Sequence, residues 1–420
     1  MNRFVIVASI VFAAAPAAVV AQTVVSQPAT VLPLKHTPPP TSPAISANVL
    51  MTRLYIRPTQ FVDDPAVMSD GPKALIFVTA VSASRLFDAP LAQIPVGAGG
   101  KLVAIDLRVK ADPVTYPARN VVVILPGSDP TVRGEYVAIG EHNDHVGVNH
   151  NPVDHDSHRI FNHIVRLGGA EDAQRQAAPA QQAEAIAELA AWRGAHPDAT
   201  RLDSIASDAD DDGSGSVSVL KIAEKLASLH PHPTRSILFV WHVDEEKGLL
   251  GSAYFTDHPT VPRDSIDTQL NIDMVGRGDA WDQTDLTKDG APIHGSPNYL
   301  QLVGSRQLST ELGDLIEQVN KDGHHGLVLD YSMDANGHPT NIYCRSDHYD
   351  YARSGIPITF FMTGGHSDYH QVSDDPQYID YEHMARVDEL IGDVALRVAN
   401  LSHRIVVDRP KPDPHGVCQQ

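Results

Sequence analysis

The sequence lacks the features that would build a disulfide framework, a nucleic-acid-binding surface or, after residue 21, a membrane anchor. Cys344 and Cys418 are the only two cysteines among 420 residues. This number excludes a disulfide-rich scaffold and leaves open whether the two pair with each other. Lys and Arg total 32 against 52 Asp and Glu, and the formal net charge of -20 excludes nucleic-acid binding through a basic face. No apolar run after residue 21 is long enough to span a bilayer.

The first 21 residues have the pattern of a secretory signal peptide. Arg3 gives a short positive start, Phe4–Ala15 is almost wholly apolar, and small residues precede a cleavage position before Gln22. The pattern predicts an exported protein, periplasmic or secreted, without a stable membrane anchor after signal cleavage.

The composition changes along the chain and predicts its domain organisation. Residues 22–47 are rich in Pro, Thr and Ser without periodicity, which is typical of a disordered linker. Residues 48–114 contain short strand-like pieces and predict a small β-rich accessory region. Residues 115–405 form the predicted main domain, and residues 406–420 a tail. Within the main domain, we interpret residues 148–207 as an insertion that forms a flap or surface helix, because part of it is rich in helix-forming Ala and Gln.

A buried strand is predicted at Ser236–Trp241, and Glu245 and Glu246 follow it closely. Open α/β sheets place their ligands at the carboxyl ends of strands. Two neighbouring carboxylates repel each other, so such a pair often lies beside a cation. The alternative is a solvated turn that happens to be acidic.

Three further predicted strands end in, or carry, a His or a carboxylate. His142 and Asp144 follow one strand on the same side of the chain, Asp273 lies within a second, and His370 follows a third. An acidic, glycine-containing segment from Asp208 to Ser216 leads into a predicted helix. A calcium loop is an alternative for this segment, but it lacks the closing Glu of an EF-hand, and acidic residues at a helix start also complement the helix dipole.

These side chains together are the ligand set of a two-metal hydrolase. Zinc binds His nitrogen and carboxylate oxygen, and paired metal ions share a bridging carboxylate. In chain order the set reads His, Asp, Glu-Glu, Asp, His, which supplies five ligands and one spare carboxylate.

The chain resembles the co-catalytic zinc exopeptidases, the family that includes bacterial leucyl aminopeptidase and aminopeptidase Y. The resemblance covers about residues 115–400. The matching motifs are Gly140–His145, Ala209–Gly215, Glu245–Ser252, Asn271–Gly276, Arg345–His348 with Gly355–Pro357, and Asp368–His370.

The resemblance implies a role for each matching position. One zinc would be held by His142 and Asp273, the other by Glu246 and His370, and Asp210 would bridge the two. Glu245 would be the general base, and Tyr369 would donate a hydrogen bond to the tetrahedral intermediate. The carboxylates of Asp144 and Asp374 would orient the rings of His142 and His370.

The implied fold is an α/β three-layer sandwich around a mixed, mostly parallel sheet, with the accessory region as a partial protease-associated domain. The implied function is that of an exported zinc aminopeptidase acting on peptides with a free N-terminus. A carboxypeptidase and a one-zinc glutaminyl cyclase are alternatives on the same fold, and a receptor-like binding module is an alternative of another class. The resemblance does not predict which N-terminal residue is preferred.

Two departures from the family pattern concern the cleft. Glu141 replaces a usual small residue beside His142, and we expect it to add negative charge at the entrance, together with the acidic run that begins at Asp208. The run between His142 and Asp210 is long, so the insertion is expected to cap the cleft and exclude folded proteins.

Overall fold

The computed structural model describes residues 118–172, 176–197, 201–414, 418 and 420, with isolated positions before residue 118 at 45–46, 84, 87, 89–90, 93 and 103–104. The chain divides into two compact units, Met1–Pro117 and Ala118–Gln420. In the first unit, β1 (Ile45–Ser46) and β2 (Val103–Ala104) pair in parallel. The rest of the predicted signal peptide, linker and accessory region lies outside the described residues.

A seven-stranded sheet organises the second unit, with strand order β12-β11-β13-β8-β4-β7-β3. The four strands β13, β8, β4 and β7 run parallel to one another, while β3 and β11 pair antiparallel with β7 and β13. The prediction of a mixed, mostly parallel sheet is therefore confirmed. The strands are β3 (Val121–Leu125), β4 (Tyr136–His142), β7 (Ser236–His242), β8 (Ile266–Ile272), β11 (Tyr299–Val303), β12 (Val328–Asp330) and β13 (Ile358–Met362). A separate antiparallel pair is formed by β9 (Gln283–Leu286) and β10 (Pro292–His294).

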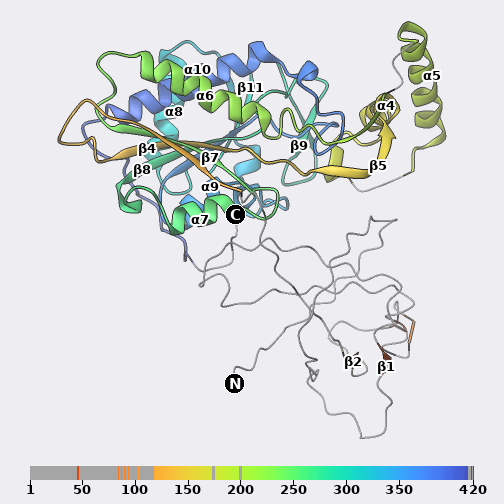
Figure 1. The fold of residues 1–420 in the computed structure, drawn as a ribbon, viewed down its shortest axis with the longest axis horizontal. Coiled ribbons are helices and arrows are strands. Elements are labelled where there is room, and N and C mark those ends of the chain that lie inside the picture. The colour runs from red at the N-terminus through yellow and green to blue at the C-terminus, as the bar shows by residue number, and fades with distance from the viewer. Residues whose placement is uncertain are drawn as a thin grey trace, which may run out of the picture. The chain divides into compact units, whose positions relative to one another are not determined.

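Helices cover both faces of this sheet and make the three layers of the predicted sandwich (Figure 1). One face carries α6 (Gly213–Ser228), α8 (Thr310–Asp322) and α10 (Tyr381–Ala399). The other carries α7 (Leu250–Asp257) and α9 (His348–Arg353). Side chains alternate between the faces along each strand, so Val137 and Ile139 of β4 enter one hydrophobic core and Ala138 enters the other. Burial on both faces explains why β7 and β13 are almost continuously apolar. The central strand β8 also carries buried polar residues, among them Gln269, which donates a hydrogen bond to Asn271 Oδ1 at 2.9 Å.

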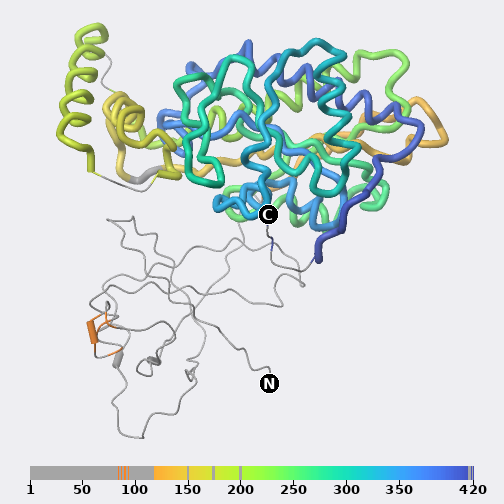
Figure 2. Tube along the Cα trace, turned by 180° about the vertical axis from the view of Figure 1, so that it is seen from behind, coloured from red at the N-terminus to blue at the C-terminus, as the bar shows by residue number. Residues whose placement is uncertain are grey.

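The insertion between β4 and α6 has secondary structure of its own. It consists of β5 (Val148–Asp154), α4 (His155–Val165), α5 (Pro179–Ala195) and β6 (Leu202–Ile205). The two strands pair antiparallel, and α4 and α5 lie side by side in both views (Figures 1 and 2). No described residue of α5 is buried, which fits the predicted surface helix.

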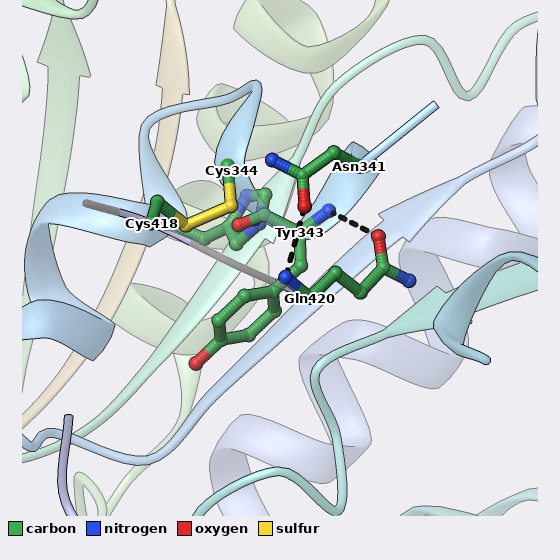
Figure 3. The surroundings of a disulfide bond; sticks show 6 residues. Asn341, Tyr343, Cys344, Cys418 and Gln420 are labelled. Atoms are coloured by element: carbon green, nitrogen blue, oxygen red, sulfur yellow. Dashed lines mark hydrogen bonds between the residues drawn. A yellow bond between two sulfur atoms is a disulfide. The ribbon is translucent and has the colours of Figure 1, made fainter. Parts of the chain in front are cut away.

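The C-terminal end is fastened to the main body by a disulfide bond between Cys344 and Cys418, which answers the question of pairing (Figure 3). Gln420 adds hydrogen bonds next to it, since its backbone nitrogen donates to Asn341 Oδ1 at 2.9 Å and its Oε1 accepts from the nitrogen of Tyr343 at 3.2 Å. Among the described residues, no helix combines the length and apolarity that a membrane crossing requires.

Candidate active site and metal centre

The predicted site residues come from loops at one edge of the sheet. β4, β8 and β7 are parallel. His142 is the last residue of β4, Asp273 follows directly after β8, and Glu246 lies shortly after β7. Because the carboxyl ends of parallel strands meet at one edge, the fold gathers these side chains. The loop after β13 adds His370, and the loop before α6 adds an aspartate.

A first cluster of potential metal ligands consists of His142, Asp211 and Asp273, all buried. Nε2 of His142 lies 3.0 Å from Asp211 Oδ1 and 3.8 Å from Asp273 Oδ1. The other oxygen of Asp273 accepts a hydrogen bond from Ser346 Oγ at 2.7 Å, which fixes the orientation of the carboxylate. Burial raises the pKa of Asp273 to about 7, with His142 opposing the shift, as expected for a carboxylate in a crowded acidic site.

A second cluster consists of Asp211, Glu246 and His370 and shares Asp211 with the first. Nε2 of His370 lies 2.8 Å from Asp211 Oδ2 and 3.0 Å from Glu246 Oε1. Burial acts to lower the pKa of His370, but its hydrogen bonds to these two carboxylates outweigh burial and raise that pKa to about 10. One aspartate therefore presents one oxygen to each cluster.

The expectation that Asp210 occupies this shared position is corrected by the structure. Asp210 Oδ1 accepts a hydrogen bond from the backbone nitrogen of Gly276 at 2.6 Å, and its Oδ2 lies 3.2 Å from His366 Nε2. The carboxylate of Asp212 also points elsewhere: it is the N-cap of α6 and accepts a hydrogen bond from the nitrogen of Gly215 at 2.8 Å. Of three consecutive aspartates, only Asp211 points between the two histidines.

The donor set fits two zinc ions. In each cluster the ligand atoms lie within 4.8 Å of one another and comprise one His nitrogen and two carboxylate oxygens, which are usual zinc ligands. Glu246 Oε1 is buried with His370 Nε2 3.0 Å away, and a buried carboxylate is costly unless a positive charge compensates it. The two clusters share one carboxylate, as a two-metal site requires.

Glu245 lies beside the clusters and belongs to neither. Its backbone nitrogen donates a hydrogen bond to Asp144 Oδ1 at 2.9 Å. Burial raises the pKa of its carboxyl well above the usual range, with His142 opposing and other acidic groups, Asp347 first, adding to the shift. A carboxylate of raised pKa that is not a metal ligand is suited to accept and return a proton.

The two carboxylates expected to orient the histidines differ in their contacts. The backbone oxygen of Asp144 lies 3.2 Å from His142 Nδ1 and its Oδ1 lies 3.6 Å away, so Asp144 does support that ring. Asp374 is not placed as expected, because its Oδ2 accepts hydrogen bonds from the backbone nitrogens of Asp210 at 2.9 Å and Asp211 at 3.3 Å. It therefore holds the loop of the shared aspartate and not the ring of His370.

The ring of Tyr369 stacks on that of His370, with centroids 4.0 Å apart. Burial, and next the charge of Asp211, raise the pKa of its hydroxyl well above the usual value, while Arg345 opposes them. The hydroxyl thus remains a hydrogen-bond donor at neutral pH.

Glu141 does not contribute charge at an entrance, contrary to expectation. It is fully buried in β4, and its Oε2 accepts a hydrogen bond from Ser216 Oγ at 2.6 Å. Burial raises its pKa well above the usual range. Asp208 is buried too and accepts a hydrogen bond from the nitrogen of Val146 at 2.9 Å. Both side chains support the loops behind the site.

Sequence reasoning missed Ser346 and a buried network around Asp347. The motif that contains both residues was recognised but received no role. Asp347 Oδ2 lies 3.6 Å from His242 Nδ1, and His242 Nε2 lies 3.0 Å from the hydroxyl of Tyr351. Ser346 and Asp347 are both buried, which the motif alone did not indicate.

Comparison with known proteins shows which family and which proteins the chain is similar to. A family model described as peptidase family M28 matches residues 120–395. Leupeptin-inactivating enzyme 1 of Streptomyces exfoliatus is 29% identical over 42% of this chain and 35% of its own length. Leucine aminopeptidase 1 of Paracoccidioides brasiliensis (strain Pb03) is 31% identical over 46% of this chain and 47% of its own length. Aminopeptidase Y of Saccharomyces cerevisiae is 26% identical over 41% of this chain and 30% of its own length.

The matched segment spans less than half of each of these relatives. Among solved structures, the LapA aminopeptidase of Legionella pneumophila aligns with 21% identity and a TM-score of 0.43, covering 68% of this chain and 56% of the other. A zinc aminopeptidase from Bacillus subtilis aligns with 18% identity and a TM-score of 0.41, covering 66% of this chain and 49% of the other.

Proposed function

Because the chain belongs to peptidase family M28, we propose that it is a zinc aminopeptidase, which removes N-terminal residues from peptides by hydrolysis. Family membership agrees with the resemblance found in the sequence and with the class of enzyme it implied. The names of the relatives, leucine aminopeptidase 1 and aminopeptidase Y, support removal from the N-terminal end.

The position of Asp211 is the observation that carries the proposal. Its two oxygens lie 3.0 Å from His142 Nε2 and 2.8 Å from His370 Nε2, so one side chain joins both clusters. On this proposal, His142 and Asp273 hold one zinc, Glu246 and His370 hold the other, and Asp211 binds both.

Each residue then has a task in peptide hydrolysis. When bound at these positions, two zinc ions would lower the pKa of a bound water and would polarise the scissile carbonyl. Glu245 accepts the proton of the attacking water and returns it to the leaving amine. Tyr369 donates a hydrogen bond from its protonated hydroxyl to the carbonyl oxygen as negative charge develops there. Asp144 holds the backbone of Glu245 and supports the ring of His142.

A peptide experiment tests which end of the substrate is recognised. Matched peptides with a free or an N-acetylated terminus are incubated with the zinc-loaded protein, and the products are identified by mass spectrometry. We expect stepwise loss of N-terminal residues from the free peptides alone. Equal cleavage of both peptides, or loss from the C-terminal end, would contradict the aminopeptidase and favour the carboxypeptidase.

Metal content separates the remaining alternatives. Elemental analysis of the purified protein should give two zinc ions per chain. One zinc would favour the glutaminyl cyclase, and none would favour the receptor-like module.

Export is also part of the proposal. A disulfide between Cys344 and Cys418 is typical of proteins in an oxidising compartment, which supports a periplasmic or secreted location. N-terminal sequencing of the mature protein after expression with residues 1–21 should begin at Gln22. An unprocessed Met1 would contradict it.

A further inference from the structure

The loop that carries His370, residues 366–378, is fastened on its inner side to the loop of the shared aspartate. Asp374 Oδ2 accepts hydrogen bonds from the nitrogens of Asp210 and Asp211 at 2.9 and 3.3 Å. The backbone oxygen of Asp374 accepts a third from the nitrogen of Ala209 at 3.0 Å. These three hydrogen bonds lie within the main body, so they hold the backbone next to Asp211 in place when the contacts of the insertion are changed.

On its outer side, the same loop is held by charged residues of the insertion. Arg159 of α4 places its guanidinium carbon 3.7 Å from the centroid of the Tyr378 ring and its Nε 3.4 Å from Asp368 Oδ2. Nε2 of His163, one turn later in α4, lies 3.4 Å from the same oxygen. Asp368 is fully buried and also pairs with Arg277 at 3.1 Å. It precedes His370 by two residues.

A second group of contacts also joins the insertion to the His370 loop. Nε2 of His155 lies 3.1 Å from Asp375 Oδ2, and Arg201 donates a hydrogen bond to the same oxygen at 2.6 Å. Nε2 of His158 lies 2.6 Å from the side-chain oxygen of Gln371.

Backbone also meets backbone beside Tyr369. The nitrogen of Ala170 donates a hydrogen bond to the carbonyl oxygen of Tyr369 at 3.1 Å. Gly169 has φ of +55°, and a β-carbon there would come within 2.7 Å of the carbonyl oxygen of His366. The approach is so close that glycine is required at this position.

His370 itself needs such support. Its φ is 55°, in the left-handed region that residues other than glycine adopt only where their surroundings hold them. The contacts around it come from the main body on one side and from the insertion on the other.

We propose that the insertion, residues 148–207, is a positioning element for the metal ligand His370, acting chiefly through Arg159 on Asp368. The inference rests on the proposed two-metal function and gives the insertion a task other than narrowing the cleft. Arg159 touches neither metal nor substrate and acts on His370 through the loop between them. Its loss leaves Asp368 buried with less compensation, so the loop relaxes and the metal site that contains His370 weakens.

The test measures the affinity of each zinc equivalent by competition with a chromophoric chelator, in the full chain and in Arg159→Met. We expect the affinity of the site that contains His370 to fall by about 10-fold, while the affinity of the other site is unchanged. A loss of this size is usual when a group that orients a metal ligand is removed. Arg159→Lys, which keeps the charge, should restore part of the affinity. His155→Gln, which changes the second group of contacts, should act in the same direction.

Arg193→Met is the matched control. Arg193 lies on α5 of the same insertion and pairs with Asp154 instead of the loop, so the change of charge is equal and both zinc affinities should stay as in the wild type. Thermal unfolding of the metal-free proteins checks that each variant folds. An equal loss at both sites, or no loss at either in folded Arg159→Met and His155→Gln, would overturn the proposal. Fewer than two zinc ions in the wild type would instead overturn the two-metal function itself.

Discussion

Asp144 Oδ1 accepts a hydrogen bond from the backbone nitrogen of Glu245 at 2.9 Å, and this contact ties the turn after β7 to the turn after β4. The same oxygen lies 3.6 Å from Nδ1 of His142. Asp144 thereby places the proposed base at a fixed position relative to a proposed metal ligand, while the side chain of Glu245 stays outside both ligand clusters.

Replacement of Glu245 by Gln should abolish most turnover and leave zinc content unchanged. The amide cannot accept the proton of the attacking water, and general-base catalysis typically contributes on the order of 10²–10⁴-fold in rate. The measurement is kcat on an aminoacyl chromogenic substrate together with zinc analysis.

Glu141→Gln is the matched control for that variant. Glu141 is a neighbouring carboxyl whose pKa burial raises well above its usual range, so a neutral isostere should be tolerated and activity retained. Loss of zinc from Glu245→Gln, or a near-normal rate, would refute the assignment of Glu245 as the base.

Two adjacent aspartates should respond differently to the same substitution. Asp211→Asn should lower zinc content below two per chain, because it removes the negative charge shared by two cations that otherwise repel at short range. Asp210→Asn should keep both zinc ions, since an amide oxygen can still accept the hydrogen bond from Gly276. Elemental analysis after gel filtration gives the zinc content of each variant. Two zinc ions in Asp211→Asn and fewer in Asp210→Asn would mean that Asp210 is the shared ligand.

The sheet, and the gathering of most candidate ligands at one edge of it, could be predicted from the sequence, since apolar runs such as the one before Glu245 indicate buried strands. Parallel strands in turn predict that His142, Asp273 and Glu246 meet at one edge. The structure brings these residues together with His370. Strand order was not predictable from these patterns, because it depends on pairings between distant segments.

The choice between Asp210 and Asp211 depends on local backbone geometry that no pattern of three identical residues encodes. Asp374 follows His370 by only four residues, but the loop turns its carboxylate towards the nitrogens of Asp210 and Asp211. Glu141 looked like a surface charge because ionised carboxyls are rarely buried, yet it lies in a strand covered on both faces.

Removal of the disulfide should destabilise the protein without removing its metal. The bond joins Cys344 to Cys418 across 74 residues, and loss of a native disulfide typically costs roughly 2–5 kcal/mol in the free energy of unfolding. Urea unfolding of Cys344→Ser/Cys418→Ser should show this loss. A reductant should destabilise the wild type and leave the double variant unaffected; if the wild type does not respond, the bond is absent in solution.

Acidification should destabilise the metal-free protein partly through His348. This ring is fully buried, lies 4.7 Å from the ring of Phe360 in a stacked arrangement, and has Nε2 2.8 Å from the carbonyl oxygen of Tyr343. Burial, against the opposing hydrogen bond to Tyr343, lowers its pKa from 6.5 to about 3. Between those values the unfolded chain binds a proton that the folded chain does not, so stability falls as pH decreases through this window.

His348→Gln isolates this contribution, because glutamine does not titrate and can still donate to Tyr343. From pH 7 to pH 5.5, the wild type should lose about 1 kcal/mol more unfolding free energy than the variant, as follows from linkage for one histidine. Urea unfolding of both metal-free proteins at the two pH values gives the difference. Comparing the two pH values within each protein removes the effect of the substitution on stability at neutral pH. An equal loss in both proteins would mean that His348 takes up its proton in the folded state, and that the core between β13 and α9 admits a charge.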